Sequence, residues 1–182
     1  MGYEAALKKA WDALGEPAAK SCYLKFFDDE YRIDYGERNI ISARRETPAR
    51  DYYKLLLLHY LANENRVPEI SGGGWISFKE LEGGEVYFPA FRKRAIEPIL
   101  KKYGDRPADI FSRAMYFDSK KMDTGSAGVS IKAFPKVNIA VILWAKDDEF
   151  SADCSILFNK EAKEILPTED LSVLGGILAS LI

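Results

Sequence analysis

The chain has 182 residues, of which 47% are hydrophobic and 30% are charged, and its formal net charge at pH 7 is -2. These values are typical of a folded domain with a sizeable core, and they exclude a wholly disordered chain. Dedicated nucleic-acid-binding domains are usually strongly basic, so the slightly acidic balance argues against that class.

Long apolar runs are missing from the sequence, and cysteines are few. The longest apolar run, residues 139–145, is far shorter than the roughly 20 residues that span a bilayer, and the first residues lack the apolar core of a signal peptide. Cys22 and Cys154 lie far apart, which argues against a disulfide scaffold and a Cys-rich metal site. We therefore expect one cytoplasmic domain over residues 1–182, with no membrane segment, metal or other cofactor.

The first third of the chain predicts two helices separated by a small sheet. Apolar residues recur at helical spacing over residues 3–14. Alternating patterns predict strands at 22–27 and 30–35 around an Asp-Asp turn, with a short third strand at 40–41. The helix predicted over residues 51–63 is apolar on nearly all sides, so we expect it near the centre of the domain.

The remainder of the chain adds further strands and helices. A short strand at 75–78 precedes a helix with Pro98 inside its pattern, which requires a kink or a restart there. A short helix at 107–117 with Asp105 as its N-cap leads to a polar segment, 118–128, that we expect to be an exposed loop. Two strands at 129–134 and 137–144 form an antiparallel pair around Pro135-Lys136.

The C-terminal segment completes an α+β fold. A strand at 154–158 and a short helix at 159–165 precede a final helix, for which Thr168 is the expected N-cap. Gly175 and Gly176 inside that helix indicate close backbone packing. The sum is a single domain with a mostly antiparallel sheet packed with about five to six helices.

The best candidate site lies between residues 71 and 103. Two glycine clusters allow the backbone to approach a partner closely, and aromatic side chains offer apolar area and stacking faces. Arginines present planar forks that bind carboxylate or phosphate. We therefore expect one concave, anion-binding surface made by residues of this stretch: Gly73, Gly74, Trp75, Phe88, Arg92 and Arg94.

The basic run Arg92-Lys93-Arg94 supplies the electrostatic part of this hypothesis. A helix that begins near Pro89 would place these side chains at the positive end of its macrodipole, and an anion would relieve the conflict. The simpler alternative is a solvated face that pairs with three nearby glutamates. The glycine run also has a simpler explanation as a flexible turn, because no Walker or GxGxxG pattern accompanies it.

His59 is the only histidine of the chain, which excludes a His-rich metal site. Because it lies in the apolar helix predicted over 51–63, we expect a buried, hydrogen-bonded ring with a structural role. The alternative is a general acid or base, which needs an open cleft and a nearby carboxylate. Cys22 and Cys154 fall in apolar strand patterns, so we expect inert thiols.

Several motifs follow one another in a distinctive order: LLLHYL, WISFKEL with a glycine pair, YFPAFRKR, FP before an apolar strand, and LPTEDLSVLG. As a set they resemble domain of unknown function 3786, an uncharacterised prokaryotic family found mainly in anaerobic bacteria and archaea. The resemblance covers nearly the whole chain but implies no activity, cofactor or catalytic residue. Some relatives are joined with modules that carry iron–sulfur cysteines, which this chain lacks, so any cluster would come through a partner.

Two classes of function follow from these residues. The favoured hypothesis is a cytoplasmic binding or accessory protein, with an aromatic- and arginine-lined site for a small anionic ligand or an acidic protein partner. The resemblance links such a protein to anaerobic redox metabolism. A third hypothesis is a purely structural subunit of an anaerobic redox complex. The alternative is an enzyme that acts on a small anionic metabolite, with His59 as general acid or base. The sequence leaves the oligomeric state open.

Overall fold

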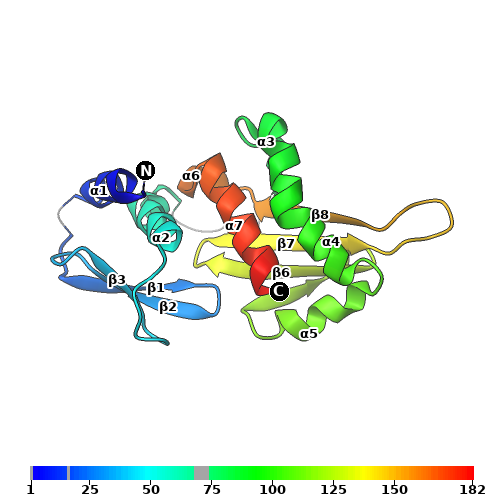
Figure 1. The fold of residues 1–182 in the computed structure, drawn as a ribbon, viewed down its shortest axis with the longest axis horizontal. Coiled ribbons are helices and arrows are strands. Elements are labelled where there is room, and N and C mark those ends of the chain that lie inside the picture. Colours follow the sequence, from blue (N-terminus) through cyan, green and yellow to red (C-terminus); the bar gives the residue numbers. More distant parts are fainter. Residues whose placement is uncertain (1, 16, 68–73) are drawn as a thin grey trace.

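Two antiparallel sheets form the frame of the fold (Figure 1). The computed structural model describes residues 2–15, 17–67 and 74–182. One sheet has the strand order β1-β2-β3, and the other has the order β4-β8-β7-β6-β5. The strands are β1 (Ser21–Phe26), β2 (Asp29–Asp34), β3 (Asn39–Ser42), β4 (Trp75–Ser77), β5 (Ser119–Met122), β6 (Ala127–Phe134), β7 (Val137–Trp144) and β8 (Asp153–Asn159).

Helices accompany both sheets. In Figure 1, α1 and α2 lie beside the first sheet, and α4 and α7 lie across one face of the second. The α-helices are α1 (Glu4–Asp12), α2 (Asp51–Asn63), α3 (Gly84–Phe91), α4 (Glu97–Tyr103), α5 (Ile110–Ala114), α6 (Ala162–Ile165) and α7 (Thr168–Leu181). None of the helices in the described ranges combines the length and apolar character needed to cross a membrane.

The predicted α+β class and antiparallel pairing are confirmed, and the predicted helix over 51–63 has the same bounds as α2. A π-helical segment, Arg92–Ile96, joins α3 to α4, so one unbroken helical run extends over residues 84–103. If this run is counted as one, the part of the chain that the structure describes contains six α-helices. The limits of the domain at residues 1 and 182 stay a prediction.

Pro98 explains the irregular turn within that run. Proline has no N–H, and its ring clashes with the carbonyl four residues earlier, here that of Arg94. In the π-helical segment the bonding extends over five residues, and the Glu97 N–H donates to the Arg92 carbonyl oxygen. The wider turn displaces the preceding carbonyls, so the helix passes through Pro98 without ending.

Aromatic contacts join the first sheet and α2 to the second sheet. Phe134 of β6 stacks on Tyr60 of α2, with ring centroids 4.5 Å apart, and contacts Phe26 of β1 at 4.7 Å. Beside them, the Phe27 N–H donates to the Ala133 carbonyl oxygen over 2.9 Å. Burial of each such ring contributes about 2–3 kcal/mol, and buried hydrophobic residues from both sheets belong to one cluster.

The helices over the second sheet pack closely because α7 carries a glycine where it meets α3. Phe91 is fully buried and stacks on Phe78, with centroids 4.1 Å apart and an interplanar angle of 4°. A Cβ at Gly175 would lie 2.6 Å from Cε2 of Phe91, whereas one at Gly176 would have no neighbour within 4 Å. The predicted close packing is therefore confirmed at Gly175 and wrong at Gly176.

Three local predictions are wrong. The segment 118–128 is not a loop, because β5 and the first residues of β6 lie in it. Pro167, not Thr168, occupies the cap position of α7, and the Thr168 hydroxyl donates instead to the Glu82 carbonyl oxygen at 2.8 Å. Asp105 does not cap the next helix, since Arg106 occupies that position.

Candidate functional site

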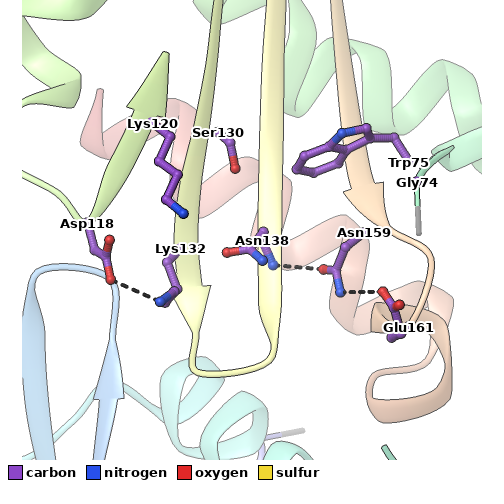
Figure 2. A pocket seen from close by; sticks show the side chains of 9 residues that line it. All are labelled: Gly74, Trp75, Asp118, Lys120, Ser130, Lys132, Asn138, Asn159 and Glu161. Atoms are coloured by element: carbon purple, nitrogen blue, oxygen red, sulfur yellow. Dashed lines mark hydrogen bonds and ion pairs between the residues drawn. The ribbon is translucent and has the colours of Figure 1, made fainter. Parts of the chain in front are cut away.

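A hollow of about 360 Å³ lies on one face of the five-stranded sheet. Figure 2 views it from the side opposite the helices of the second sheet, which lie behind the strands. The volume is near the lower end of the range of small-molecule sites, roughly 300–1,000 Å³. The lining residues come from both edges of the sheet and from the strands between them: Gly74, Trp75, Asp118, Lys120, Ser130, Lys132, Asn138, Asn159 and Glu161.

The strand register brings distant side chains into one row across the hollow. Residues that are paired between neighbouring strands project from the same face of a sheet. Trp75 of β4 is paired with Asn159 of β8, and Lys132 of β6 is paired with Asn138 of β7. These four residues form a row in which an aromatic side chain stands at one end and a lysine at the other (Figure 2).

Asn159 fixes the middle of this row. It is only 4% exposed, and its side-chain oxygen accepts a hydrogen bond from the Asn138 backbone N–H at 2.8 Å. Its amide nitrogen donates to the Lys136 carbonyl oxygen at 3.2 Å and to the Glu161 carboxylate at 3.0 Å. A buried amide with all its groups bonded holds its neighbours in place. Asn159 therefore shapes the hollow and has no free group for a ligand.

The opposite side of the hollow carries positive charge. Lys132 pairs with Asp118 at 3.1 Å, and both side chains are about 40% exposed. Lys120, paired in register with Ser130, has no hydrogen bond or ion pair within the described ranges of the chain. Lys121 projects from the other face of β5, where its ammonium lies 4.5 Å from the centre of the Phe111 ring.

Trp75 forms the wall that faces the lysines. In Figure 2 its indole extends over β8 toward the middle of the sheet, and the side chain is half-buried. The residue before it, Gly74, has φ +123° and accepts a hydrogen bond from the Lys160 N–H at 3.2 Å. Side chains are strained at this φ, so glycine is required for the chain to enter β4 and place the indole.

The structure does not bring the predicted arginines to this hollow. Arg92 lies 3.9 Å from Asp153, at the start of β8, whereas Trp75 is paired with Asn159 at its end. Seven residues of strand separate the two ends by about 20 Å. Arg94 lines a separate groove of about 200 Å³ between α3 and α7.

Two further members of the predicted site are also placed elsewhere. Phe88 is half-buried on α3, and the Lys79 ammonium lies 4.4 Å from the centre of its ring. Gly73 lies outside the residues that the structure describes. Of the predicted ligand-binding residues, the hollow therefore contains Gly74 and Trp75.

The dipole argument for an anion at the arginines is wrong. The helix begins at Gly84, and Pro89 lies inside α3, so Arg92 and Arg94 occupy the middle of the helical run. Macrodipole effects are confined to the first and last turns of a helix. The positive end of this helix is therefore a full two turns away from the arginines, and their position requires no anion.

Comparison with protein families identifies the chain. Residues 7–180 match the family described as domain of unknown function (DUF3786). The chain belongs to this family. No curated protein and no solved structure matches the chain. Membership of DUF3786 therefore identifies the family of the chain but does not identify a ligand for the hollow.

His59 of this DUF3786 chain is hydrogen-bonded but not sealed. Its Nδ1 lies 2.6 Å from a carboxylate oxygen of Asp170 on α7, and the side chains are 34% and 13% exposed. The predicted bond is confirmed, and the predicted full burial is wrong because the ring lies at the contact between α2 and α7. A histidine–aspartate pair also satisfies one requirement of the enzyme hypothesis, but His59 is not among the residues that line the hollow.

The His59–Asp170 pair predicts how stability depends on pH. The hydrogen bond to Asp170 raises the pKa of His59 above its ordinary value of 6.5, against the opposing effects of burial and of Lys9. The extra stability is therefore fully present below pH 6.5 and lost as the pH rises through the higher pKa of the folded state. We expect His59→Gln to cost about 1 kcal/mol at pH 6 and less at pH 9, measured by urea unfolding.

A double-mutant cycle with Asp170→Asn isolates the pair from other effects of the two substitutions. The coupling free energy between His59 and Asp170 should fall as the pH rises from 6 to 9. Equal coupling at both values would show that protonation of His59 adds nothing to the contact.

The cysteines differ in their surroundings. Cys154 is 3% exposed, and burial raises the pKa of its thiol to about 12, which suppresses the reactive thiolate. Cys22 is half-buried, and its sulfur accepts a hydrogen bond from the Tyr35 hydroxyl at 3.0 Å. The described part of this DUF3786 chain contains no group of three or more His, Cys, Asp or Glu side chains arranged to bind a metal.

Proposed function

We propose that the chain is a binding or accessory protein that holds a small anionic ligand in the hollow beside Trp75. The observation that carries the proposal is the Lys120 ammonium, which has no partner in the described ranges and faces the hollow. Its charge is available to a ligand without loss of an existing ion pair. We include the predicted cytoplasmic location and the link to anaerobic redox metabolism in this proposal.

Neutral polar groups on the floor of the hollow support a ligand of mixed character. The Ser130 hydroxyl and the Asn138 carboxamide line it and have no hydrogen-bond partner among the described residues. Ligand sites typically combine apolar area with a few polar groups that fix orientation. Trp75 supplies the apolar wall, and Gly74 and Trp75 are the residues that this proposal shares with the site predicted from sequence.

The enzyme hypothesis is less well supported. A general acid or base must lie within hydrogen-bond reach of the reacting group. His59 is directed at Asp170 between two helices, and the hollow contains Trp75, lysines, asparagines and a serine without a histidine. The acidic-partner version is also less favoured, because a hollow of about 360 Å³ on the face of the sheet suits a small ligand.

Alanine variants of the adjacent residues Lys120 and Lys121 test the anion site. Ribose 5-phosphate titrated into isotopically labelled protein should shift the amide signals of β5 and β6. Lys120→Ala should weaken this binding about tenfold, because a charge-assisted contact is lost. Lys121→Ala should change the dissociation constant less than twofold, since that side chain projects from the opposite face.

Two results would contradict the proposal. If ribose 5-phosphate and small carboxylates leave the β5 and β6 signals unchanged, the hollow is not an anion site. Equal weakening by the two alanine variants would indicate a diffuse electrostatic effect of the surface, which salt would screen.

A further inference from the structure

We propose that the ligand is a nucleoside monophosphate, with its base on the face of Trp75 and its phosphate at Lys120 and Lys132. This inference rests on the proposed function, because it names the ligand of the same hollow. Three independent features carry it: the chemistry of the cations, the position of the aromatic side chain, and the distance between them.

The cations favour phosphate over carboxylate. Both charges on the basic side of the hollow are lysine ammonium groups from neighbouring strands, and the lining residues include no arginine. Ammonium groups act as point charges that bind phosphate without a fixed orientation. Two of them match the roughly two negative charges of a phosphate monoester better than the single charge of a carboxylate. The Ser130 hydroxyl lies in register with Lys120 and can donate to a phosphate oxygen.

The aromatic side chain favours a ligand with a flat ring. The Trp75 indole extends over the sheet on the same side as the lysines (Figure 2). Bases stack on aromatic side chains irrespective of their identity, because each base has a π-face. The Asn138 carboxamide, which lies in the same row between Trp75 and Lys132, offers both a donor and an acceptor to a ligand in the hollow. A sugar phosphate without a base would leave the indole unused.

The separation of the two ends suits a mononucleotide. Trp75 and Lys132 stand on strands that are three positions apart in the sheet. Neighbouring strands lie about 4.8 Å apart, so the two Cα atoms are separated by about 14 Å. The indole extends into that interval, whereas the Lys132 ammonium is directed to Asp118 on the side away from Trp75, and the hollow has a volume of about 360 Å³. A base, a ribose and one phosphate can bridge the remaining space.

The charge balance limits the ligand to a single phosphate. Two lysines face the hollow, but Asp118 lies 3.1 Å from Lys132 and neutralises part of its charge. Glu161, at the other end of the row, adds a second carboxylate, which accepts a hydrogen bond from Asn159. A triphosphate carries several more negative charges than these lysines can balance, and the two carboxylates would repel it.

The test compares the nucleotides AMP, GMP, CMP and UMP with ribose 5-phosphate and adenosine. At least one nucleotide should bind about tenfold or more tightly than ribose 5-phosphate, and the gain should disappear in Trp75→Leu. Adenosine should bind at least tenfold more weakly than AMP in the wild-type protein. Trp144→Phe is the matched control, since it removes the exposed tryptophan at the far end of β7.

Asp118→Asn is expected to increase nucleotide affinity, and a gain of affinity cannot result from loss of folding. It removes a negative charge and releases Lys132, so nucleotide affinity should rise severalfold. The ion pair is about 40% exposed on both sides, so its loss should change stability little.

The outcomes separate this inference from the proposed function. If ribose 5-phosphate binds as tightly as every nucleotide and Trp75→Leu has no effect, the anion site stands and the nucleotide assignment is wrong. If neither the nucleotides nor ribose 5-phosphate binds, both proposals are wrong. Weaker nucleotide binding in Asp118→Asn would place the phosphate away from Lys132 and overturn the stated orientation.

Discussion

Phe91→Ala should lower the free energy of unfolding by about 3–5 kcal/mol, the largest effect expected of a single substitution among those considered. Phe91 is fully buried and touches three layers of the structure: it stacks on Phe78, contacts Phe158 of β8, and lies against Gly175 of α7. Truncation opens a cavity that small movements of α3, α7 and the sheet cannot fill. Urea unfolding with an unchanged m value measures the loss.

Phe88→Ala is the matched control, one helical turn earlier on the same element. Phe88 is half-buried and contacts Phe91 only at a centroid distance of 6.4 Å. Its removal should cost no more than about 1–1.5 kcal/mol. If Phe91→Ala does not fold, Phe91→Leu should still cost more than Phe88→Ala. Equal losses at the two positions would mean that Phe91 does not organise the contact between α3 and α7.

Two neighbouring glycines of α7 should respond to alanine with opposite signs. At Gly175 the new Cβ would lie 2.6 Å from Cε2 of Phe91 and 3.4 Å from the Cβ of Ala95. Overpacking of this kind costs about 1–3 kcal/mol, which outweighs the gain in helix propensity of at most about 1 kcal/mol. At Gly176 there is no neighbour within 4 Å, so only the gain remains.

We therefore expect Gly175→Ala to lower the free energy of unfolding by about 1–2 kcal/mol and Gly176→Ala to raise it by about 0.5–1 kcal/mol. Both are measured by chemical unfolding in the same buffer. The comparison is controlled internally, because the two substitutions have the same chemistry in the same helix. Stabilisation by both would show that Phe91 moves aside without cost.

The fold could be predicted where the pattern of apolar residues decides the structure. β6 has the predicted type because its apolar residues alternate with polar ones, whereas β7 and the 51–63 helix are apolar on nearly all sides and could be predicted from the length of their apolar runs. β5 was missed because it is a short edge strand with a polar sequence, Ser119–Met122, which has no apolar alternation. Edge strands are often short and charged, so composition alone describes them as loops.

The candidate site could be predicted only in part for a related reason. Trp75 and Gly74 stand out as residue types, and they do line the hollow. The lysines meet them through pairings of β4 with β8 and of β5 with β6, which residue types do not reveal. Ser130, Lys132 and Asn138 did carry a signal, because they are the polar positions of otherwise apolar strands.

The pairing of β4 with β8 also determines when the hollow can exist. Trp75 is paired with Asn159, 84 residues later in the chain, whereas β5, β6 and β7 are joined by short connections. Closing a local hairpin costs little conformational entropy, whereas forming a contact between residues far apart in the sequence costs more. On a ribosome, the lysine side could be assembled from a partial chain, but the aromatic wall requires that synthesis has passed residue 159. The hollow proposed as the ligand site is therefore complete only in chains whose synthesis has passed β8.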